Sequence, residues 1–226
     1  MKKRFVFLAA ALAAMLLTGC ALRTVEEMYA LPKRSEEFRE LQAAIDTAMY
    51  GMTYSSPQSG ENQQTVQTVD LNGDGLDEYL VFAKGATEKP LQVLIFQQDE
   101  TGKCRVLDTI GFNGQAFDQV EYMAFDDQPG LELVVGIQVS ERVLRNVAVY
   151  SFHGGSAELL LLNSYSKMLP CQLSGDKSEL MVLRPGEEET QRGMAVLYGY
   201  DNGQIVRSVE TELSEHTSRI RRITTG

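Results

Sequence analysis

The pattern of apolar and polar residues divides the chain into an apolar N-terminal run, one helical stretch and a long series of short strands. In residues 35–50 the apolar side chains recur at spacings of three and four, which predicts an amphipathic helix. Its apolar stripe consists of Phe38, Leu41, Ile45 and Ala48. Residues 51–64 are rich in Ser, Gly, Pro, Asn and Gln, which predicts a loop. We expect the helix to act as a lid on the following domain; partner binding is the alternative.

From Thr65 onward, short apolar strands alternate with polar turns in a pattern that occurs three times. Each unit contains a strand that begins at a glutamate, and these glutamates, which are 54 and 47 residues apart, are Glu78, Glu132 and Glu179. One strand precedes each glutamate, and two further strands joined by a glycine-containing turn follow it. The units cover residues 65–112, 118–163 and 166–213.

Four strands per unit at a period near 50 residues are typical of the blades of a β-propeller. A single blade cannot bury both of its faces, so neighbouring units must stack on one another. The expected fold is therefore all-β, with one N-terminal helix and three four-stranded propeller-like blades within residues 65–226. A twisted β-sandwich built from the same hairpins is the alternative that this pattern leaves open.

Residues 218–226 match the first strand of a unit, most closely Val120 to Phe125. A propeller needs about four blades or more to close. We therefore expect a partial β-propeller of three blades and the first strand of a fourth. The predicted helix could cover the flank of the first blade, but the outer flank of the third would have only that lone strand. We therefore expect that this chain alone is marginally stable or self-associates, and that its gene or a neighbouring one encodes further blades of the same period.

The N-terminal run has the organisation of a secretory signal peptide. Basic residues at positions 2–4 precede the apolar stretch Phe5–Leu17, which is shorter than the roughly 20 residues that a membrane-spanning helix needs. The run ends in Leu17-Thr18-Gly19-Cys20, which resembles the lipobox of bacterial lipoproteins. This resemblance implies that residues 1–19 are removed and that Cys20 carries diacylglycerol with palmitate-type acyl chains.

Residues 20–34 would then be a lipidated tether, and the chain would lie on the extracytoplasmic face of a cell membrane. Two acyl chains anchor a protein stably, because each buried methylene contributes about 0.8 kcal/mol. The alternative is an ordinary signal peptide in which Cys20 is accidental.

The charge and the cysteines of the chain indicate which molecules and ions it would bind. The formal net charge is −10, and removing residues 1–19, with three basic residues and no acidic ones, changes it to −13. Such a chain disfavours nucleic acid and anionic lipid headgroups and attracts cations. Cys104 and Cys171 match no zinc pattern and fall in non-adjacent units, so we interpret them as small apolar residues.

The segment from Asp70 to Glu78 alternates oxygen-bearing residues with others, between the first two strands of the first unit. Calcium takes six to eight oxygen ligands at about 2.3–2.6 Å, and such a loop turns alternate residues towards one centre. The expected ligands of one Ca²⁺ are the side chains of Asp70, Asn72, Asp74 and Glu78 and the carbonyl of Leu76. The loop is not an EF-hand, because its twelfth position is Val81 and no helices flank it. A bare Asx-rich turn is the alternative.

The stretch from Asp70 to Phe82 resembles the FG-GAP or VCBS repeat, the calcium-loop blade of the integrin-α propeller and of many exported bacterial proteins. The resemblance extends over about Thr65 to Gly226 and implies calcium binding where the motif is complete. The second loop, Asp126–Gly130, is shortened, and the third, Leu173–Asp176, keeps one carboxylate, so we expect a metal in the first loop alone. The N-terminal layout also resembles lipoproteins of Clostridia-type gut bacteria.

Sequence motifs of catalysis are absent: the chain contains no GxSxG, HExxH or phosphate-loop pattern. His153 falls in a predicted hairpin turn and His216 in a loop, and the run Glu187–Glu189 falls in a hairpin tip, where side chains are usually solvated. We predict no catalytic residues and favour a non-enzymatic binding or scaffold module for an extracellular protein or glycan. The alternative is a cell-envelope or carbohydrate-active enzyme whose catalytic part is missing or unrecognised.

Overall fold

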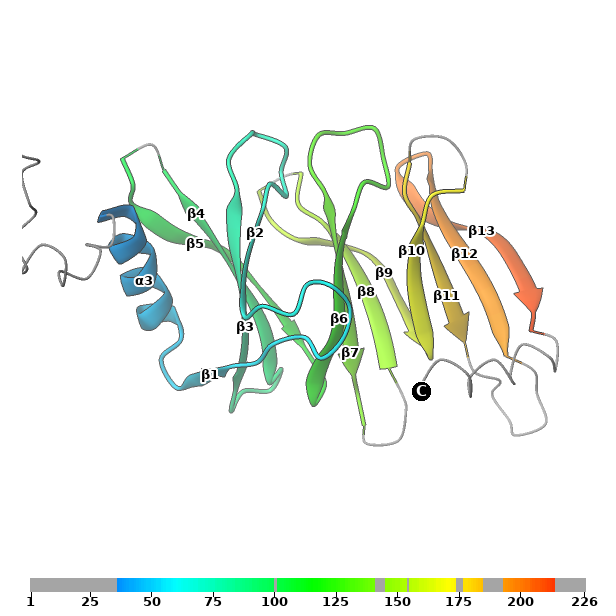
Figure 1. Cartoon of the computed structure of the whole chain (residues 1–226), viewed down its shortest axis with the longest axis horizontal. Helices are drawn as coiled ribbons and strands as arrows, with labels where there is room; N and C mark the ends of the chain where they lie inside the picture. Colours follow the sequence, from blue (N-terminus) through cyan, green and yellow to red (C-terminus); the bar gives the residue numbers. More distant parts are fainter. Residues whose placement is uncertain are drawn as a thin grey trace, which may run out of the picture. The chain divides into compact units, whose positions relative to one another are not determined.

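The computed structural model describes residues 36–99, 101–140, 145–153, 155–173, 177–184 and 193–213. These residues form one helix and three antiparallel sheets (Figure 1). The predicted signal peptide, the tether with Cys20 and the strand expected in residues 218–226 lie outside the described residues, as do His216 and Glu187–Glu189. No helix in the described part of the chain is long and apolar enough to cross a bilayer.

The first sheet contains β1 (Met52–Tyr54), β2 (Val66–Val69), β3 (Glu78–Gly85), β4 (Leu91–Gln98) and β5 (Cys104–Phe112). β1 and β2 pair with successive halves of the same edge of β3, so this sheet is four strands wide. The second sheet contains β6 (Ala116–Met123), β7 (Glu132–Gln138), β8 (Arg145–Ser151) and β9 (Glu158–Tyr165). The third contains β10 (Lys167–Cys171), β11 (Glu179–Arg184), β12 (Met194–Asp201) and β13 (Gln204–Glu212).

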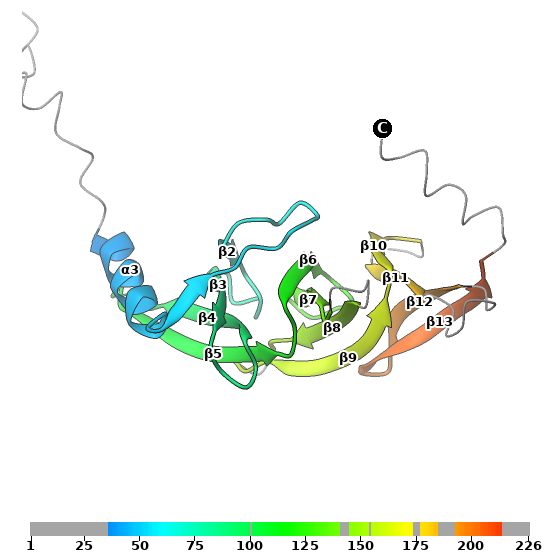
Figure 2. The same cartoon turned by 90° about the horizontal axis from the view of Figure 1, so that it is seen from below.

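Within each sheet the strands follow one another in chain order, and every neighbouring pair is antiparallel. The first strands (β2, β6, β10) lie along one side and the last strands (β5, β9, β13) along the other (Figure 2). The expected all-β fold with three four-stranded antiparallel sheets is therefore confirmed. Among the described residues, no core cluster joins the third sheet to the first, and no closed ring is formed.

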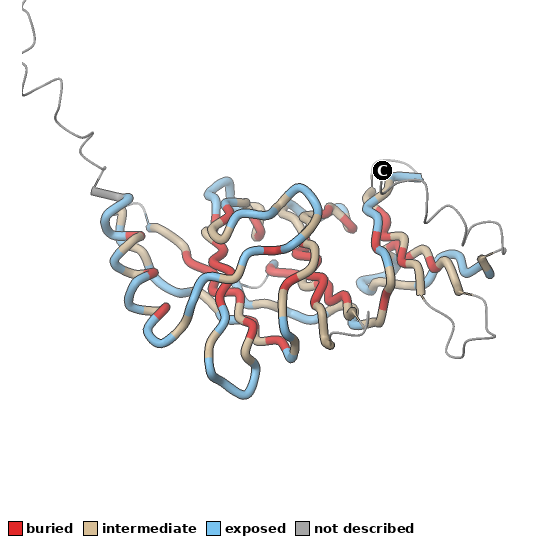
Figure 3. The backbone as a smooth tube through the Cα atoms, turned by 60° about the horizontal axis from the view of Figure 1, so that its bottom comes forward, coloured by how far each residue is buried: buried red, intermediate tan, exposed pale blue. Residues whose placement is uncertain are grey.

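Burial is concentrated in the middle of each sheet and falls off at the turns (Figure 3). β3 and β7 are almost continuously apolar and buried, because both faces of their sheets are covered. The last strands (β5, β9 and β13) are instead only partly buried. In β13, six consecutive residues from Arg207 to Glu212 are exposed. The near-continuous apolar runs of the sequence thus mark the strands that pack on both sides.

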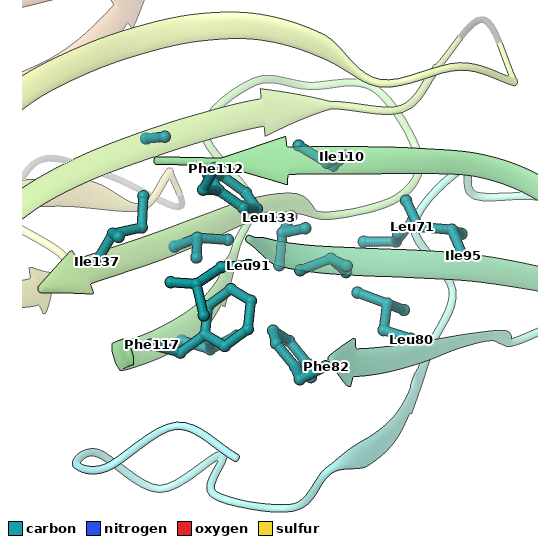
Figure 4. Packing of buried hydrophobic residues seen from close by; sticks show 14 of the residues in the cluster. Leu71, Leu80, Phe82, Leu91, Ile95, Ile110, Phe112, Phe117, Leu133 and Ile137 are labelled. Atoms are coloured by element: carbon teal, nitrogen blue, oxygen red, sulfur yellow. The ribbon is translucent and has the colours of Figure 1, made fainter. Parts of the chain in front are cut away.

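Consecutive sheets pack face to face through two apolar cores. The core between the first and second sheets includes Leu80, Phe82, Val93, Ile95, Phe117, Val120, Leu133 and Val135, most of them drawn in Figure 4. Phe82 and Phe117 meet edge to face with ring centroids 5.1 Å apart. The second core joins Val134, Val147 and Val149 of the second sheet to Met168, Leu180 and Val182 of the third. Each buried side chain of this kind contributes about 1.5–3 kcal/mol, so stacking is the main stabilising interaction.

The number of residues that separates a strand residue from the glutamate decides whether its side chain packs on the preceding or on the following sheet. The residue after the glutamate faces the preceding sheet, as Leu133 and Leu180 do. The next residue faces the following sheet, so Leu80 and Val134 are both fully buried. Met181 occupies the same position in the third sheet but is only half-buried.

Met181 belongs to an apolar row that crosses all four strands of the third sheet. Its members, joined by direct cross-strand pairing, are Leu169, Met181, Leu197 and Val209. Leu169 and Val209 are exposed, the latter to 54%. We call the face that carries this row the forward face of the third sheet. No described residue covers it, although the equivalent faces of the first two sheets are buried under the next sheet.

The helix α3 (Glu36–Ala48) covers the opposite face of the first sheet. Its residues Leu41 and Ile45, with Met49 just beyond its end, pack against an apolar patch of Val81, Ala83, Leu94 and Phe96. The helix thus lies where a lid was expected. Phe38, predicted to belong to the stripe, is 45% exposed.

The segment predicted as a loop in residues 51–64 is partly ordered by pairing. It contains β1, and beyond β1 it crosses to the first strand of the second sheet (Figure 1). The N–H groups of Gln58 and Ser59 donate to the Asp118 carbonyl at 2.9 and 2.7 Å, and the Asn62 amide donates to the Val120 carbonyl at 3.1 Å. The interpretation as loop was wrong for β1, because Met52–Tyr54 pairs with the edge of β3; residues 58–62 instead satisfy the edge of β6.

Both cysteines in the described residues are free. Cys104 packs at the margin of the helix core, and the Cys171 thiol donates to the Glu179 carbonyl at 3.2 Å. Burial raises the pKa of both thiols, with the backbone N–H of Arg105 acting in the opposite sense on Cys104. They are therefore poor nucleophiles at neutral pH.

Equivalent substitutions in the second and third sheets should distinguish a covered face from an open one. Val149→Asp places a charge in a dry core and should lower the free energy of unfolding by about 4 kcal/mol or more. Leu197→Asp, at the matching position of the third sheet, should cost the monomeric chain only about 1–2 kcal/mol because its carboxylate reaches water there. Urea unfolding at chain concentrations too low for self-association measures both, and equal losses would show that another part of the same chain covers the forward face.

Candidate metal-binding loops

The loops between the first and second strands of the three sheets lie at the same end (Figure 1). Neighbouring loops are in direct contact: the Leu131 N–H donates to the Leu71 carbonyl at 3.3 Å, and the Ser178 N–H to the Ala124 carbonyl at 2.8 Å. A side chain at Gly73 would meet the backbone of Pro129 at 2.3 Å, and its positive φ of 75° also favours glycine. The first two loops therefore pack too closely for other residues at this point.

Each of these loops is closed by the buried glutamate that begins the second strand. Glu78 accepts the Leu71 N–H at 2.9 Å, Glu132 accepts the Phe125 N–H at 2.9 Å, and Glu179 accepts the Leu173 N–H at 3.1 Å. Glu78 is 0% exposed and Glu132 1%. The repeated glutamate of the sequence thus has one structural role, which is to hold the backbone just after the preceding strand. In the first two sheets its second oxygen faces Asn72 and His153, respectively.

In the first loop, two predicted ligands fix the backbone. The two carboxylate oxygens of Asp70 accept the N–H groups of Gly73 and Gly75 at 2.7 and 2.9 Å. Asp74 accepts the Leu76 N–H at 2.8 Å, while the Leu76 side chain is half-exposed. These are Asx-type turns, and a carboxylate that accepts one N–H per oxygen still has lone pairs free for a cation.

The remaining first-loop groups converge on Glu78. The Asn72 amide lies 3.0 Å from Glu78 Oε1 and 3.1 Å from Asp74 Oδ2, and the Gln97 amide lies 3.5 and 3.3 Å from the same two oxygens. Burial raises the pKa of Glu78, and the neighbouring Asp74 and Asp70 raise it further. The structure thus brings Asn72, Asp74 and Glu78 together, while Asp70 is turned to the loop backbone.

The second loop forms a tighter group of ligand atoms. Asp126 Oδ2 lies 3.3 Å and Glu132 Oε1 3.4 Å from Nε2 of His153, at the turn between β8 and β9. Within the described residues, this is the one set of three His, Cys, Asp or Glu ligand atoms that all lie within 4.8 Å of one another. Burial raises the pKa of Glu132, and Asp126 raises it further. The second loop therefore groups three ligand-type side chains, which the expectation of a metal in the first loop alone did not anticipate.

Sequence reasoning missed His153 because its partners are 27 and 21 residues away in the chain. Two signals could have found it. Glu132 aligns with the predicted ligand Glu78, and the antiparallel pairing of β7 with β8 returns the chain to the same end of the sheet. In the third loop, where residues 174–176 lie outside the described residues, Glu179 holds the Leu173 N–H.

Comparison with known proteins adds one structural likeness. No family model matches the chain, and no curated protein matches it. Among solved structures, the chain is similar to that of the exotype rhamnogalacturonan lyase YesX, with 15% sequence identity and a TM-score of 0.42. The match covers 71% of this chain but only 33% of the lyase, and at this TM-score it says nothing of chemistry or ligand.

The glutamate that closes the third loop can be tested without interference from metal ligands. Glu179→Ala removes the acceptor of the Leu173 N–H and should lower the free energy of unfolding by about 1–2 kcal/mol. Glu158→Ala, at an exposed position of β9, should change it by less than about 0.5 kcal/mol. If urea unfolding gives the same midpoint for both variants, the loop does not depend on this hydrogen bond.

Proposed function

We propose that the chain is a lipid-anchored, non-enzymatic binding or scaffold module whose first loop, Asp70–Glu78, binds one Ca²⁺. The observation that supports calcium is the environment of Glu78. Its carboxylate is fully buried beside Asp74 and Asp70, and the contacts described around it come from amides and backbone N–H groups. A buried carboxylate next to two others is costly without a compensating cation.

Calcium fits the donor set better than other common ions. The side chains of Asp70, Asn72, Asp74 and Glu78 and the carbonyl of Leu76 offer oxygen only, which is what this hard cation requires. For Asn72 the side-chain oxygen would turn towards the ion; it now accepts the Asp74 N–H at 2.8 Å. Such a change needs only an amide rotation, with the Asp70 turn left in place.

Calcium binding should be visible as stabilisation of the folded chain. Saturating Ca²⁺ should raise the melting temperature of the wild type, because binding at 100 times the dissociation constant adds about 2.7 kcal/mol to stability. Asp74→Ala should abolish that increase, whereas Asp77→Ala, an exposed neighbour, should keep it. A melting temperature that does not respond to Ca²⁺ would leave the loop as a turn only, and a response that survives Asp74→Ala would place the ion elsewhere.

The location follows from the N-terminal sequence. We propose that Cys20 carries diacylglycerol and tethers the chain to the extracytoplasmic face of a cell membrane. A fatty-acid probe supplied to expressing cells should label the wild type and not Cys20→Ser, since the thiol is the attachment atom. Equal labelling of the two would contradict the anchor.

We further propose that the three sheets are blades of a partial β-propeller and that its forward face pairs with a second copy of the chain. Continuity with the two internal interfaces supports this: the row through Met181 and Leu197 occupies the positions that the next sheet buries in the first and second sheets. Sedimentation of the wild type should show a dimer that Leu197→Asp dissociates. A monomeric wild type would overturn self-association.

The charge of the sequence supports a proposal for the class of ligand. A formal charge of −13 after removal of residues 1–19 favours neutral or cationic partners over nucleic acid. We propose an extracellular protein or glycan, bound through the loops at the ends of the sheets.

A further inference from the structure

The second loop contains a carboxylate oxygen that is buried and has no hydrogen-bond partner. Glu132 is 1% exposed, and its Oε1 is the one such side-chain atom among the described residues. It points at the imidazole of His153, with Nε2 at 3.4 Å, and Asp126 Oδ2 lies 3.3 Å from the same nitrogen. Buried polar atoms almost always have a hydrogen-bond partner or a bound ion, so a partner is expected for this oxygen.

Both carboxylates are held in place by their other oxygen. Glu132 Oε2 accepts the Phe125 N–H at 2.9 Å, and Asp126 Oδ1 accepts the Gln128 N–H at 2.8 Å. The oxygens that face His153 are therefore fixed in position by the backbone. Ligands restrained in this way lose little conformational freedom when an ion binds.

We infer that Asp126, Glu132 and His153 form a binding site for a divalent transition-metal ion of the Zn²⁺ class. The combination of one imidazole nitrogen with two carboxylate oxygens fits this class, whereas Ca²⁺ and Mg²⁺ take oxygen ligands. Three protein ligands leave a fourth position of a tetrahedral ion for water or for a group of a bound partner.

The competing arrangement is a simple ion pair between protonated His153 and the two acids. A single Nε2–H points along one direction, so it cannot form a well-aligned hydrogen bond to both oxygens. In the present geometry Nε2 of His153 is hydrogen-bonded to Asp126 Oδ2 at 3.3 Å, which leaves Oε1 of Glu132 without a hydrogen-bond partner. Lys177, the cation contributed by the neighbouring third loop, pairs with Asp127 at 2.7 Å.

A metal at this site would connect two segments of the second sheet whose equivalents in the first sheet are connected in a different way. Asp126 and Glu132 flank the loop between β6 and β7, and His153 lies in the turn after β8. The metal would therefore clamp the loop of the second sheet to its own hairpin. The Ser178 N–H, next to β11, donates to the carbonyl of Ala124, two residues before Asp126, at 2.8 Å, so the site lies against the following sheet.

The test uses the purified full chain without a polyhistidine tag, and Zn²⁺ itself as the probe. Calorimetric titration should show one Zn²⁺ per chain in the wild type. His153→Ala and Glu132→Gln should each weaken binding by at least about tenfold, since each removes one ligand. Glutamine retains an oxygen that can accept the Phe125 N–H, and His153 is partly exposed, so both variants should keep the fold seen by circular dichroism.

Three matched variants serve as controls. Asp127→Asn changes a carboxylate of the same loop that faces Lys177, and His216→Ala changes the other histidine of the chain. Both should bind Zn²⁺ like the wild type, and so should Asp74→Ala, because this inference does not rest on the calcium site. Absence of Zn²⁺ binding, or binding that survives His153→Ala, would overturn it and leave an ion pair. Loss of Ca²⁺ stabilisation alone would leave it intact.

Discussion

In every sheet, a backbone N–H just after the first strand donates to a buried glutamate at the start of the second, and the geometry of the candidate metal-binding loops depends on this bond. Glu78, Glu132 and Glu179 occupy this position. A carboxylate buried so far from water must be compensated, and one oxygen bonded to one N–H is only half of that compensation. What faces the second oxygen then differs: two amides in the first loop and an imidazole in the second. A common structural role thus gives loops that present different sets of ligand atoms.

The face-to-face stacking of the sheets determines where these loops meet. Residues one and two positions after the glutamate point to opposite faces, so one sequence step decides whether a side chain packs on the preceding or the following sheet. This alternation brings Gly73 against Pro129 and places Tyr200 beside Asp126. It also leaves the forward face of the third sheet half-exposed, whereas α3 covers the rear face of the first. The open face and the grouping of the loops are therefore consequences of the same repeat.

The sequence predicted the three units, their four antiparallel strands and the helix on the first sheet, because apolar spacing records which faces are buried. It did not predict that Ser59 and Asn62 hydrogen-bond to β6. In a sequence, a polar side chain that pairs with an edge strand cannot be distinguished from one that faces water. It also did not predict the grouping of side chains at the second loop. Asp126, Glu132 and His153 become neighbours only through the pairing of β7 with β8, and no local spacing encodes that contact.

The central claim is that the buried glutamates of the first two loops are compensated by bound cations of two different kinds. It is tested most directly by elemental analysis of the full chain after equilibrium with limiting Ca²⁺ and Zn²⁺ together and removal of free ions. The account predicts one equivalent of calcium and one of zinc retained by the same molecule. A chain that retains neither would show that amides and an imidazolium suffice to compensate Glu78 and Glu132, and would contradict it.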